Sequence, residues 1–201
     1  MASLLIATHN KGKARELLAL LTPLGLSLIT LSEVEPKIPE PQEWGHDFLA
    51  NARIKAHYYA DAAGFPALAD DSGLRVTALG GRPGVNSARY GREGLSDEAR
   101  NSALLAEMGN ISDRRAYFEV VLVLAKPEGP DLCWTGRLDG EIAWEQIGDQ
   151  GFGYDPIFIF PPKGKTLAQL TGPEKNSLSH RAAAILALKE DLDKVALFLA
   201  K

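Results

Sequence analysis

The stretch that most limits the possible folds is Ala116–Ala125, AYFEVVLVLA, which is rich in β-branched and aromatic residues. Such a composition favours a β-strand over a helix. A six-residue turn, KPEGPD, leads into a second strand predicted over Leu132–Leu138, so the two strands would form a hairpin. Asp139-Gly140 is typical of a further turn, here into Glu141–Trp144. The middle of the chain is therefore predicted to be antiparallel β-structure.

Segments with the apolar spacing of helices lie on both sides of this hairpin. Helices are predicted over residues 46–63 and 96–108. A first helix is predicted from the spacing of Ala14, Leu17, Leu18 and Leu21, and a terminal helix opens at Ser179-His180-Arg181 and has a stripe through Ile185, Leu188, Leu192 and Val195. Short strands are predicted over Ser3–Ala7, Leu26–Leu31 and Ala67–Ala69, with a proline-rich loop at 33–45 and a polar connection at 164–178. Helices at both ends of an antiparallel middle indicate an α/β or α+β architecture and not a purely parallel sheet.

The composition limits the class of protein. Its 201 residues, of which 45% are hydrophobic and 24% charged, suit one compact domain with a substantial core. The 22 basic and 26 acidic residues give a net charge of −4, which argues against a protein that binds nucleic acid by neutralising its phosphates. A single cysteine cannot form an internal disulfide, and the sequence contains no signal-like start and no long apolar run. We therefore expect a cytoplasmic protein without membrane or nucleic-acid partners.

Two adjacent carboxylates, Asp70 and Asp71, stand between the apolar residues Ala67–Ala69 and the pair Ser72-Gly73. If they end a buried strand, and Gly73 lets the backbone turn, their oxygens can be presented to a hard cation in a cleft. The alternative is plain turn chemistry, because Asp, Ser and Gly are typical of places where a strand ends. From this stretch alone both interpretations stay open.

The first strand leads into a polar loop, Thr8-His9-Asn10-Lys11-Gly12-Lys13, at the start of a helix. Free backbone N–H groups at a helix start, with two lysines beside them, favour an anion such as phosphate. The loop is not a Walker A motif, because the leading glycine is absent and Ala14 follows Gly12-Lys13. Taken alone, a capped helix with an exposed basic first turn is the simpler interpretation.

Several other positions have a structural and a functional interpretation. Lys55 lies at the edge of an apolar helix stripe, where it either extends its charge to solvent or faces a phosphate. Glu43 is either a solvated loop carboxylate or a metal ligand. The aromatic segment Gln150–Phe160 either stacks on a purine base or fills the core. His180 and Arg181 stand in a first helical turn, where cations oppose the helix dipole, and a ligand would explain them.

Together these segments resemble the motifs of the inosine triphosphate pyrophosphatase family, the house-cleaning hydrolases of purine nucleotides. The resemblance rests on THNKGKARELL, NARIKA, ADDSGLRVTALGGRPGVNSARY, GFGYDPIF and EKNSLSHR, which occur in this order over nearly the whole chain. GFGYDPIF and SHR are more specific than the first loop. Two positions depart from the family pattern: His9, where a small residue is common, and Gln169, where Glu is common.

The resemblance implies a function and a fold. The function is Mg²⁺-dependent hydrolysis of aberrant purine nucleoside triphosphates, such as ITP, dITP and XTP, to the monophosphate and pyrophosphate. The fold is an elongated α/β structure whose mixed sheet is flanked by helices, with two lobes around a central cleft in one domain, residues 1–201. The family also implies a homodimer.

Carried over residue by residue, the resemblance implies the members of the site. Substrate would contact Thr8, His9, Asn10, Lys11, Gly12, Lys13, Ser72, Phe152, Gly153, Tyr154, Asp155, Lys175, His180 and Arg181, of which 152–155, Lys175, His180 and Arg181 would form the nucleobase pocket. Glu43 and Asp71 would hold Mg²⁺, and Asp71 would also be the general base. Asp70 would support catalysis nearby, and Lys55 would face the phosphates.

The chemistry of these side chains agrees with that function. A carboxylate beside a metal can orient and deprotonate water for in-line attack at the α-phosphorus. Donors aimed at O6, from the side chains of His180 and Arg181 or from the N–H groups at the helix start, would select a 6-oxo purine over adenine. The 2-amino group of guanine would have to be rejected by residues that the sequence does not identify.

Three other classes of protein compete with this hypothesis. Pyrimidine-directed house-cleaning pyrophosphatases begin with a Ser- and Arg-rich loop, which THNKGK does not resemble. A non-catalytic nucleotide sensor would not need the set Glu43, Lys55, Asp70 and Asp71. A nucleic-acid-binding module is disfavoured by the acidic net charge.

Overall fold

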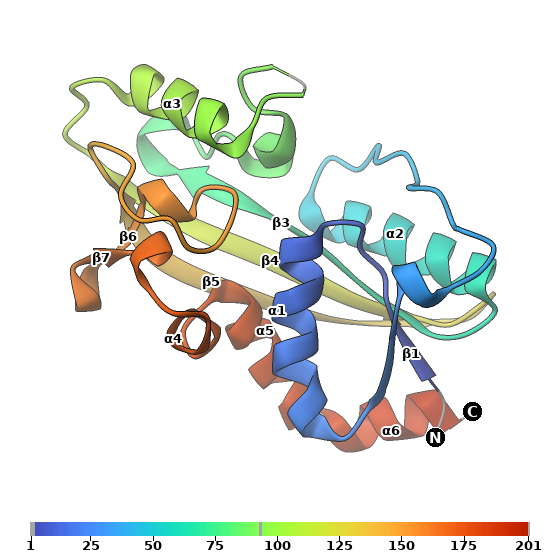
Figure 1. The fold of residues 1–201 in the computed structure, drawn as a ribbon. Coiled ribbons are helices and arrows are strands. Elements are labelled where there is room, and N and C mark those ends of the chain that lie inside the picture. The colour runs from blue at the N-terminus through green and yellow to red at the C-terminus, as the bar shows by residue number, and fades with distance from the viewer. Residues whose placement is uncertain (1–2, 93, 201) are drawn as a thin grey trace. The chain divides into compact units, whose positions relative to one another are not determined.

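A computed structural model describes residues 3–92 and 94–200 (Figure 1). The strands are β1 (Ser3–Ile6), β2 (Ser27–Thr30), β3 (Ala67–Val76), β4 (Arg115–Ala125), β5 (Asp131–Ile142), β6 (Phe158–Phe160) and β7 (Lys165–Thr166). The helices are α1 (Lys11–Leu21), α2 (Phe48–Ala63), α3 (Asp97–Met108), α4 (Gly172–Asn176), α5 (His180–Glu190) and α6 (Leu192–Ala200). The predicted α/β architecture is confirmed.

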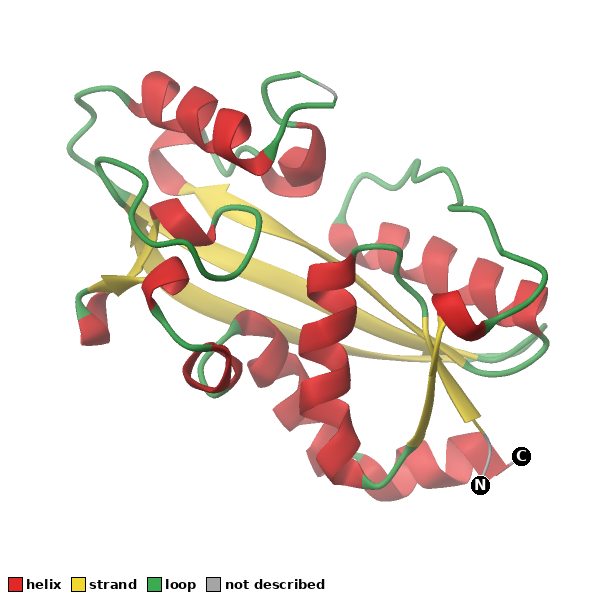
Figure 2. Cartoon of the chain, in the orientation of Figure 1, coloured by secondary structure: helices red, strands yellow, loops and turns green. Residues whose placement is uncertain are grey.

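The seven strands form one mixed sheet in the order β2-β1-β3-β4-β5-β6-β7, drawn in yellow in Figure 2. β1 pairs in parallel with β2 and with β3. Because Ile6 pairs with Leu68, the loop after β1 lies level with the part of β3 that carries Asp70 and Asp71. β6 pairs antiparallel with β5 and with β7. The sheet is therefore parallel at one end of the strand order and antiparallel at the other, which agrees with the mixed sheet that the family resemblance implies.

The chain divides into two compact units, each with its own apolar core. Unit 1 comprises the described residues of 1–71, 120–136 and 181–201, and unit 2 those of 72–119 and 137–180. The core of unit 1 is built around Leu4, Ile6, Leu17, Leu21, Leu68, Val120, Leu122, Ile185 and Leu188. The core of unit 2 is built around Leu74, Leu104, Met108, Phe118, Leu138, Tyr154, Ile157 and Phe158. The predicted central cleft stays a prediction.

Local capping explains why the predicted helices start and end where they do. Asp47 precedes α2, and its side chain accepts a hydrogen bond from the N–H of Ala50 at 2.8 Å. Gly64 ends α2 in the left-handed conformation, with φ at 73°. Ser96 precedes α3 and accepts from the N–H of Ala99. These residues satisfy backbone groups that a helix end would otherwise leave open.

The prediction that a strand ends at Asp70 and turns at Gly73 is wrong. β3 continues for ten residues, from Ala67 to Val76, straight through the two carboxylates. Asp and Gly are common in turns, because Gly adopts bent backbone conformations and the Asp side chain bonds nearby backbone groups. Asp can also lie in a buried strand when its carboxylate is paired with a cation. The ion pairs of these two residues, described below, supply that condition.

The predicted turn at Asp139-Gly140 is also wrong, because β5 runs unbroken to Ile142 and pairs there with β6. Gly140 serves close packing instead. A Cβ at this position would lie 2.4 Å from the carbonyl oxygen of Ile159 and 2.5 Å from the ring of Phe158. A glycine inside a strand can thus mark close approach and not a turn.

The last third of the chain contains more structure than predicted. The polar connection at 164–178 includes β7 and the short helix α4, and Leu167, Ala168 and Leu170 within it are buried. The single terminal helix is in fact two helices, α5 and α6, separated at Asp191. No helix in residues 3–92 and 94–200 is long and apolar enough to cross a membrane.

Replacing Gly140 by Ala should destabilise unit 2, because the new methyl group would press against backbone and an aromatic ring. We expect the free energy of unfolding in urea to fall by about 2 kcal/mol, as for other overpacked positions. Gly172→Ala is the matched control, since a Cβ there meets no atom within 4 Å. Equal stability of the two variants would contradict this explanation of Gly140.

Candidate active site

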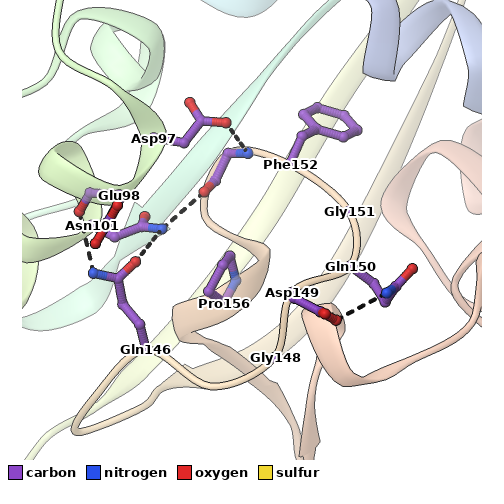
Figure 3. A pocket seen from close by; sticks show the side chains of 11 residues that line it. Asp97, Glu98, Asn101, Gln146, Gly148, Asp149, Gln150, Gly151, Phe152 and Pro156 are labelled. Atoms are coloured by element: carbon purple, nitrogen blue, oxygen red, sulfur yellow. Dashed lines mark hydrogen bonds between the residues drawn. The ribbon is translucent and has the colours of Figure 1, made fainter.

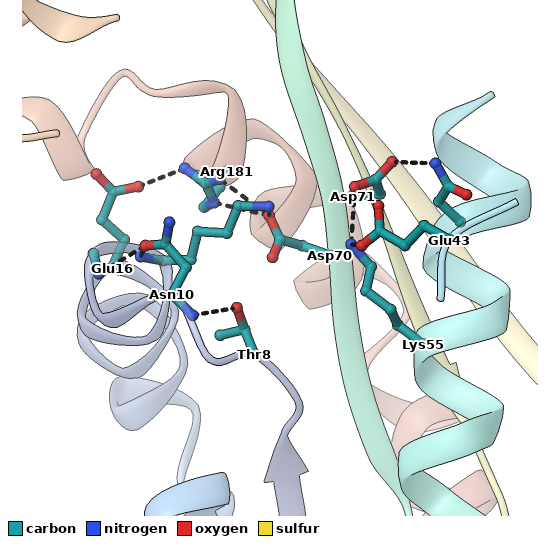
Figure 4. A network of polar contacts seen from close by, with 11 residues as sticks. Thr8, Asn10, Glu16, Glu43, Lys55, Asp70, Asp71 and Arg181 are labelled. Atoms are coloured by element: carbon teal, nitrogen blue, oxygen red, sulfur yellow. Dashed lines mark hydrogen bonds and ion pairs between the residues drawn. The ribbon is translucent and has the colours of Figure 1, made fainter. Parts of the chain in front are cut away.

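Asp70 and Asp71 are neighbours on β3, and consecutive residues of a strand point to opposite faces. Figure 4 shows Asp70 directed toward α1 and the start of α5, whereas Asp71 is directed toward α2. The two residues are only 1% and 7% exposed. Each carboxylate is therefore the centre of its own buried cluster of charges, and both clusters belong to unit 1.

The Asp70 cluster consists of Asp70, Lys13, Glu16 and Arg181. The guanidinium of Arg181 donates from Nη2 to Asp70 Oδ2 at 3.0 Å and from Nη1 to Glu16 Oε2 at 2.9 Å. Lys13 Nζ lies 3.1 Å from the same Asp70 oxygen. Burial raises the pKa of Asp70, but the attraction of Lys13 and Arg181 outweighs it and holds that pKa well below its usual range. Asp70 is thus fixed as an ionised counter-ion.

The Asp71 cluster consists of Asp71, Glu43, Asn51 and Lys55. Lys55 Nζ lies 2.8 Å from Asp71 Oδ1 and 3.0 Å from Glu43 Oε1. Asn51 Nδ2 donates to the other oxygen, Asp71 Oδ2, at 3.2 Å. Burial raises the pKa of Asp71, and the attraction of Lys55 and Lys13 does not fully offset it. Asp71 therefore holds a proton more readily than an ordinary aspartate, and far more readily than Asp70.

The two buried lysines differ in the same way. Burial lowers the pKa of Lys13, and Asp70 offsets this only in part. Burial also opposes the charge of Lys55, but the attraction of Asp71, Asp70 and Glu43 is larger and raises its pKa. A further anion would therefore stabilise the charged form of Lys13 most, because Lys55 already faces several carboxylates. Lys55 is buried in ion pairs, so the interpretation that it extends its charge to solvent is wrong.

The loop before α1 is held by its own side chains. Asn10 Oδ1 accepts hydrogen bonds from the N–H groups of Gly12 at 2.9 Å and Lys13 at 3.0 Å. Thr8 Oγ1 accepts from the N–H of Asn10, and the ring of His9 lies 3.1 Å from the carbonyl oxygen of Ile38. The prediction that these helix-start N–H groups are free for an anion is therefore wrong for Gly12 and Lys13. An anion at this loop would rely on the lysine side chains instead.

Magnesium is implied by the family resemblance, and the Asp71 cluster fits it. Oxygens of Glu43 and Asp71 converge on a single cation, the ammonium of Lys55. Mg²⁺ prefers carboxylate oxygens and usually takes one or two from the protein, with water and substrate phosphates completing its shell. Within residues 3–92 and 94–200 no three His, Cys, Asp or Glu side chains are grouped as metal ligands.

Of the predicted nucleobase residues, 152–155, Lys175 and His180 lie in unit 2, whereas Arg181 lies in unit 1. Asp155 Oδ2 accepts a hydrogen bond from the N–H of Phe152 at 2.8 Å and forms a short ion pair with Lys175. Lys175 Nζ also lies 4.6 Å from the centre of the Phe152 ring. A Cβ on Gly151 would collide with Asp155 Oδ2, so only glycine allows this tight turn. Phe152 as a whole is half-buried.

Two other members of the predicted nucleobase set contact the core. Tyr154 is 4% exposed, and its hydroxyl donates to the carbonyl oxygen of Ser87 at 2.8 Å. The interpretation as a core aromatic therefore holds for Tyr154. The buried ring of His180 stacks on Phe118, with centroids 4.9 Å apart. Ser72 follows Asp71 within β3. Contact of these residues with substrate stays a prediction.

Two members of the clusters, Asn51 and Glu16, were missed in the sequence interpretation. Asn51 is 1% exposed, and besides bonding Asp71 it accepts from the N–H of Gly45 at 2.8 Å. It lies four residues before Lys55, on the same helix face, which was the available signal. Glu16 lies three residues after Lys13 on α1. The carboxylates of Glu16 and Asp70 supply the negative charge that explains Arg181 in a first helical turn.

Comparison with known proteins gives close relatives over almost the full chain. A dITP/XTP pyrophosphatase of Thermus thermophilus is 49% identical over 187 residues, which cover 92% of this chain and 89% of the relative. A dITP/XTP pyrophosphatase of Syntrophobacter fumaroxidans is 47% identical over 194 residues, which cover 96% of this chain and 83% of the relative.

Solved structures agree with these relatives. A HAM1 protein from Coxiella burnetii is 39% identical and superposes with a TM-score of 0.87, covering 96% of this chain and all of the other. The Ham1 protein of Staphylococcus aureus is 40% identical, with a TM-score of 0.84 and coverage of 96% and 98%. The sequence profile of the Ham1 family matches residues 4–191. These matches confirm the resemblance seen in the motifs: the chain belongs to the Ham1 family.

Proposed function

We propose that this protein hydrolyses aberrant purine nucleoside triphosphates, dITP and XTP among them, to the monophosphate and pyrophosphate. The observation that carries the proposal is the similarity, over almost the full chain, to relatives named dITP/XTP pyrophosphatase. The paired charges of unit 1 are the residue types that phosphoryl chemistry needs, namely buried lysines beside carboxylates. Such an activity would remove these nucleotides from the pool before a polymerase uses them.

The charge balance of unit 1 supports a role for magnesium. Three cations, Lys13, Lys55 and Arg181, face four carboxylates, so the clusters have no spare positive charge for a triphosphate. An added divalent cation would correct this, with Glu43 and Asp71 as its protein ligands. When bound, Mg²⁺ would neutralise phosphate oxygens and stabilise the leaving pyrophosphate. This role rests on the resemblance and on the convergence of the two carboxylates.

Asp71 is the proposed general base. Its pKa is raised by burial, which increases its affinity for a proton at the moment when water attacks. Water would give a proton to Asp71, its oxygen would bond to the α-phosphorus, and the bond from that phosphorus to pyrophosphate would break. Asp70 is not proposed as a base, because its ion pairs with Lys13 and Arg181 lower its pKa and keep it ionised. Its proposed role is to hold Lys13 and Arg181 in place.

Selection of a 6-oxo purine is assigned to the group around Phe152. Its ring would stack on the base, and Asp155 with Lys175 would bind polar edges of the base. The guanidinium of Arg181 already donates to Glu16 and Asp70. Donation to O6 from the N–H groups at the start of α5 therefore fits better than donation from that guanidinium. A homodimer is proposed from the family resemblance, and a cytoplasmic location is proposed from the single cysteine, which suits a reducing compartment.

Activity is tested by incubating the purified protein separately with dITP, XTP, ITP, dATP and dGTP in the presence of Mg²⁺. We expect pyrophosphate from the first three nucleotides at rates at least about tenfold above dATP, because hydrogen-bond donors aimed at O6 disfavour the amino group of adenine. A comparably low rate with dGTP is expected from the family resemblance alone. Addition of EDTA should stop the reaction. Release of orthophosphate in place of pyrophosphate, or equal rates for dATP and dITP, would contradict the proposed function.

The different roles of the two aspartates predict opposite mutant phenotypes. Asp71→Asn should lower turnover of dITP at least about 100-fold, the usual size of general-base catalysis, while nucleotide binding by calorimetry persists. Asp70→Asn should lower the free energy of unfolding by about 3 kcal/mol, because it leaves Arg181 and Lys13 with too little buried negative charge.

The linkage between pKa and stability gives the sign of this difference. The folded-state pKa of Asp70 is below its ordinary value, so its charge stabilises the fold at pH 7, and this stability is lost as pH falls through that pKa. The pKa of Asp71 is raised, so neutralising it removes no such contribution at pH 7. Near-normal turnover of Asp71→Asn, or a larger stability loss in Asp71→Asn than in Asp70→Asn, would refute the assignment.

A further inference from the structure

Residues 148–153, which include Phe152, border a cavity of about 500 Å³ in unit 2. The other walls are Asp97, Glu98 and Asn101 of α3 together with Gln146 and Pro156 (Figure 3). Because this side of the segment faces open volume, apolar packing cannot fix its position there. Its conformation toward α3 must depend on hydrogen bonds.

Those hydrogen bonds converge on one residue, Gly153. Its N–H donates to Asp97 Oδ2 at 2.6 Å, and its carbonyl oxygen accepts from Asn101 Nδ2 at 3.0 Å. Both backbone groups of Gly153 are thus held by side chains one turn apart on α3, an arrangement we call the Gly153 clamp. Gly153 has φ at 63°, a left-handed conformation that other residues rarely adopt.

The two side chains of the clamp are themselves fixed. Asp97 Oδ1 accepts from Arg100 Nη1 at 2.8 Å. Asn101 is 1% exposed, and its amide nitrogen also lies 3.3 Å from Gln146 Oε1. Because both neighbours of that nitrogen are acceptors, the amide can have only this orientation. Gln146 in turn donates to the carbonyl oxygen of Glu98 at 3.2 Å, which closes the network on α3.

The position of Gly153 determines that of the predicted base-binding groups. Phe152 precedes it, and the N–H of Phe152 donates to Asp155 Oδ2, which also pairs with Lys175. A shift of Gly153 would therefore move the Phe152 ring and disturb the Asp155–Lys175 pair together. The clamp can therefore fix the positions of both the Phe152 ring, which would stack on a base, and the Asp155–Lys175 pair, which would bind its polar edges.

We infer that Asp97 and Asn101 are positioning residues for purine recognition, acting through Gly153 on Phe152 and Asp155. The inference rests on the proposed function, and it goes beyond it by assigning a role to α3. The clamp contributes to binding and selection of the base and not to the chemical step. Its loss changes KM and the preference for a 6-oxo purine, while kcat is preserved.

The test compares Asp97→Ala, Asp97→Asn and Glu98→Ala. Asp97→Ala removes the acceptor of the Gly153 N–H, so we expect KM for dITP to rise about tenfold, the effect of one lost hydrogen bond, with kcat within about twofold. The preference for dITP over dATP should fall as well. Asp97→Asn keeps an oxygen at this place and should restore KM, which a role of the negative charge alone would not allow.

Glu98→Ala is the matched control, because Glu98 is also an acidic residue in the first turn of α3 and lines the same cavity. Glu98→Ala loses the same interaction with the helix dipole as Asp97→Ala, but it leaves both side-chain hydrogen bonds to Gly153 in place. Its KM should therefore stay near the wild-type value. Amide hydrogen exchange at Gly153, followed by NMR, should become faster in Asp97→Ala and stay unchanged in Glu98→Ala.

The outcomes distinguish a failure of the proposed function from a failure of the Gly153 clamp. No turnover of any purine nucleotide by the wild-type protein would overturn the proposed function, and the role in selection with it. Normal wild-type turnover, with an equal KM in Asp97→Ala and Glu98→Ala, would overturn the clamp alone. A similar rise of KM in Asp97→Asn and Asp97→Ala would also overturn it, because charge would then matter and the hydrogen bond to Gly153 would not.

Discussion

The buried contact of Arg181 with Asp70 and Glu16 is the interaction on which the architecture of unit 1 depends. It joins residues of α1, β3 and α5 that are up to 165 positions apart in the chain. Charges so completely removed from water are tolerated only when they are paired and hydrogen-bonded. Once Arg181 is held by two carboxylates, β3 can continue through Asp70 without a turn. The start of α5 is then fixed beside the loop that precedes α1, and Lys13 joins the same cluster.

Alternation along β3 then separates two aspartates that are indistinguishable in the sequence. Asp70 faces two cations, which hold its pKa low and commit it to the fold. Asp71 faces Lys55, but also Glu43, and burial leaves its pKa raised. Asp71 can therefore exchange a proton, whereas Asp70 stays ionised. A single extended backbone thus provides a fixed counter-ion on one face and a proton acceptor on the other, and the reaction proposed for this Ham1 protein requires both.

Strong local patterns predicted much of this fold. The apolar run of β4, the spacing of α2 and the capping residues of α3 are properties of short segments, so the sequence alone identifies them. Asp70–Gly73 and Gly140 were misjudged because their roles depend on partners elsewhere: buried cations for the former and the Phe158 ring for the latter. Asn51 and Glu16 were missed because their polar side chains look ordinary until Asp71 and Arg181 lie beside them. The motifs contain most residues of the two charge clusters, but they cannot show which carboxylate pairs with which cation.

The difference in proton affinity between Asp70 and Asp71 can be measured by site-resolved NMR titration of their carboxyl carbons in metal-free protein. We expect Asp70 to stay ionised at every pH at which the protein remains folded, and Asp71 to take up its proton above the ordinary pKa of about 3.9. Titration of Asp70 at or above that value, or of Asp71 at a lower pH than Asp70, would refute the different roles of the two aspartates.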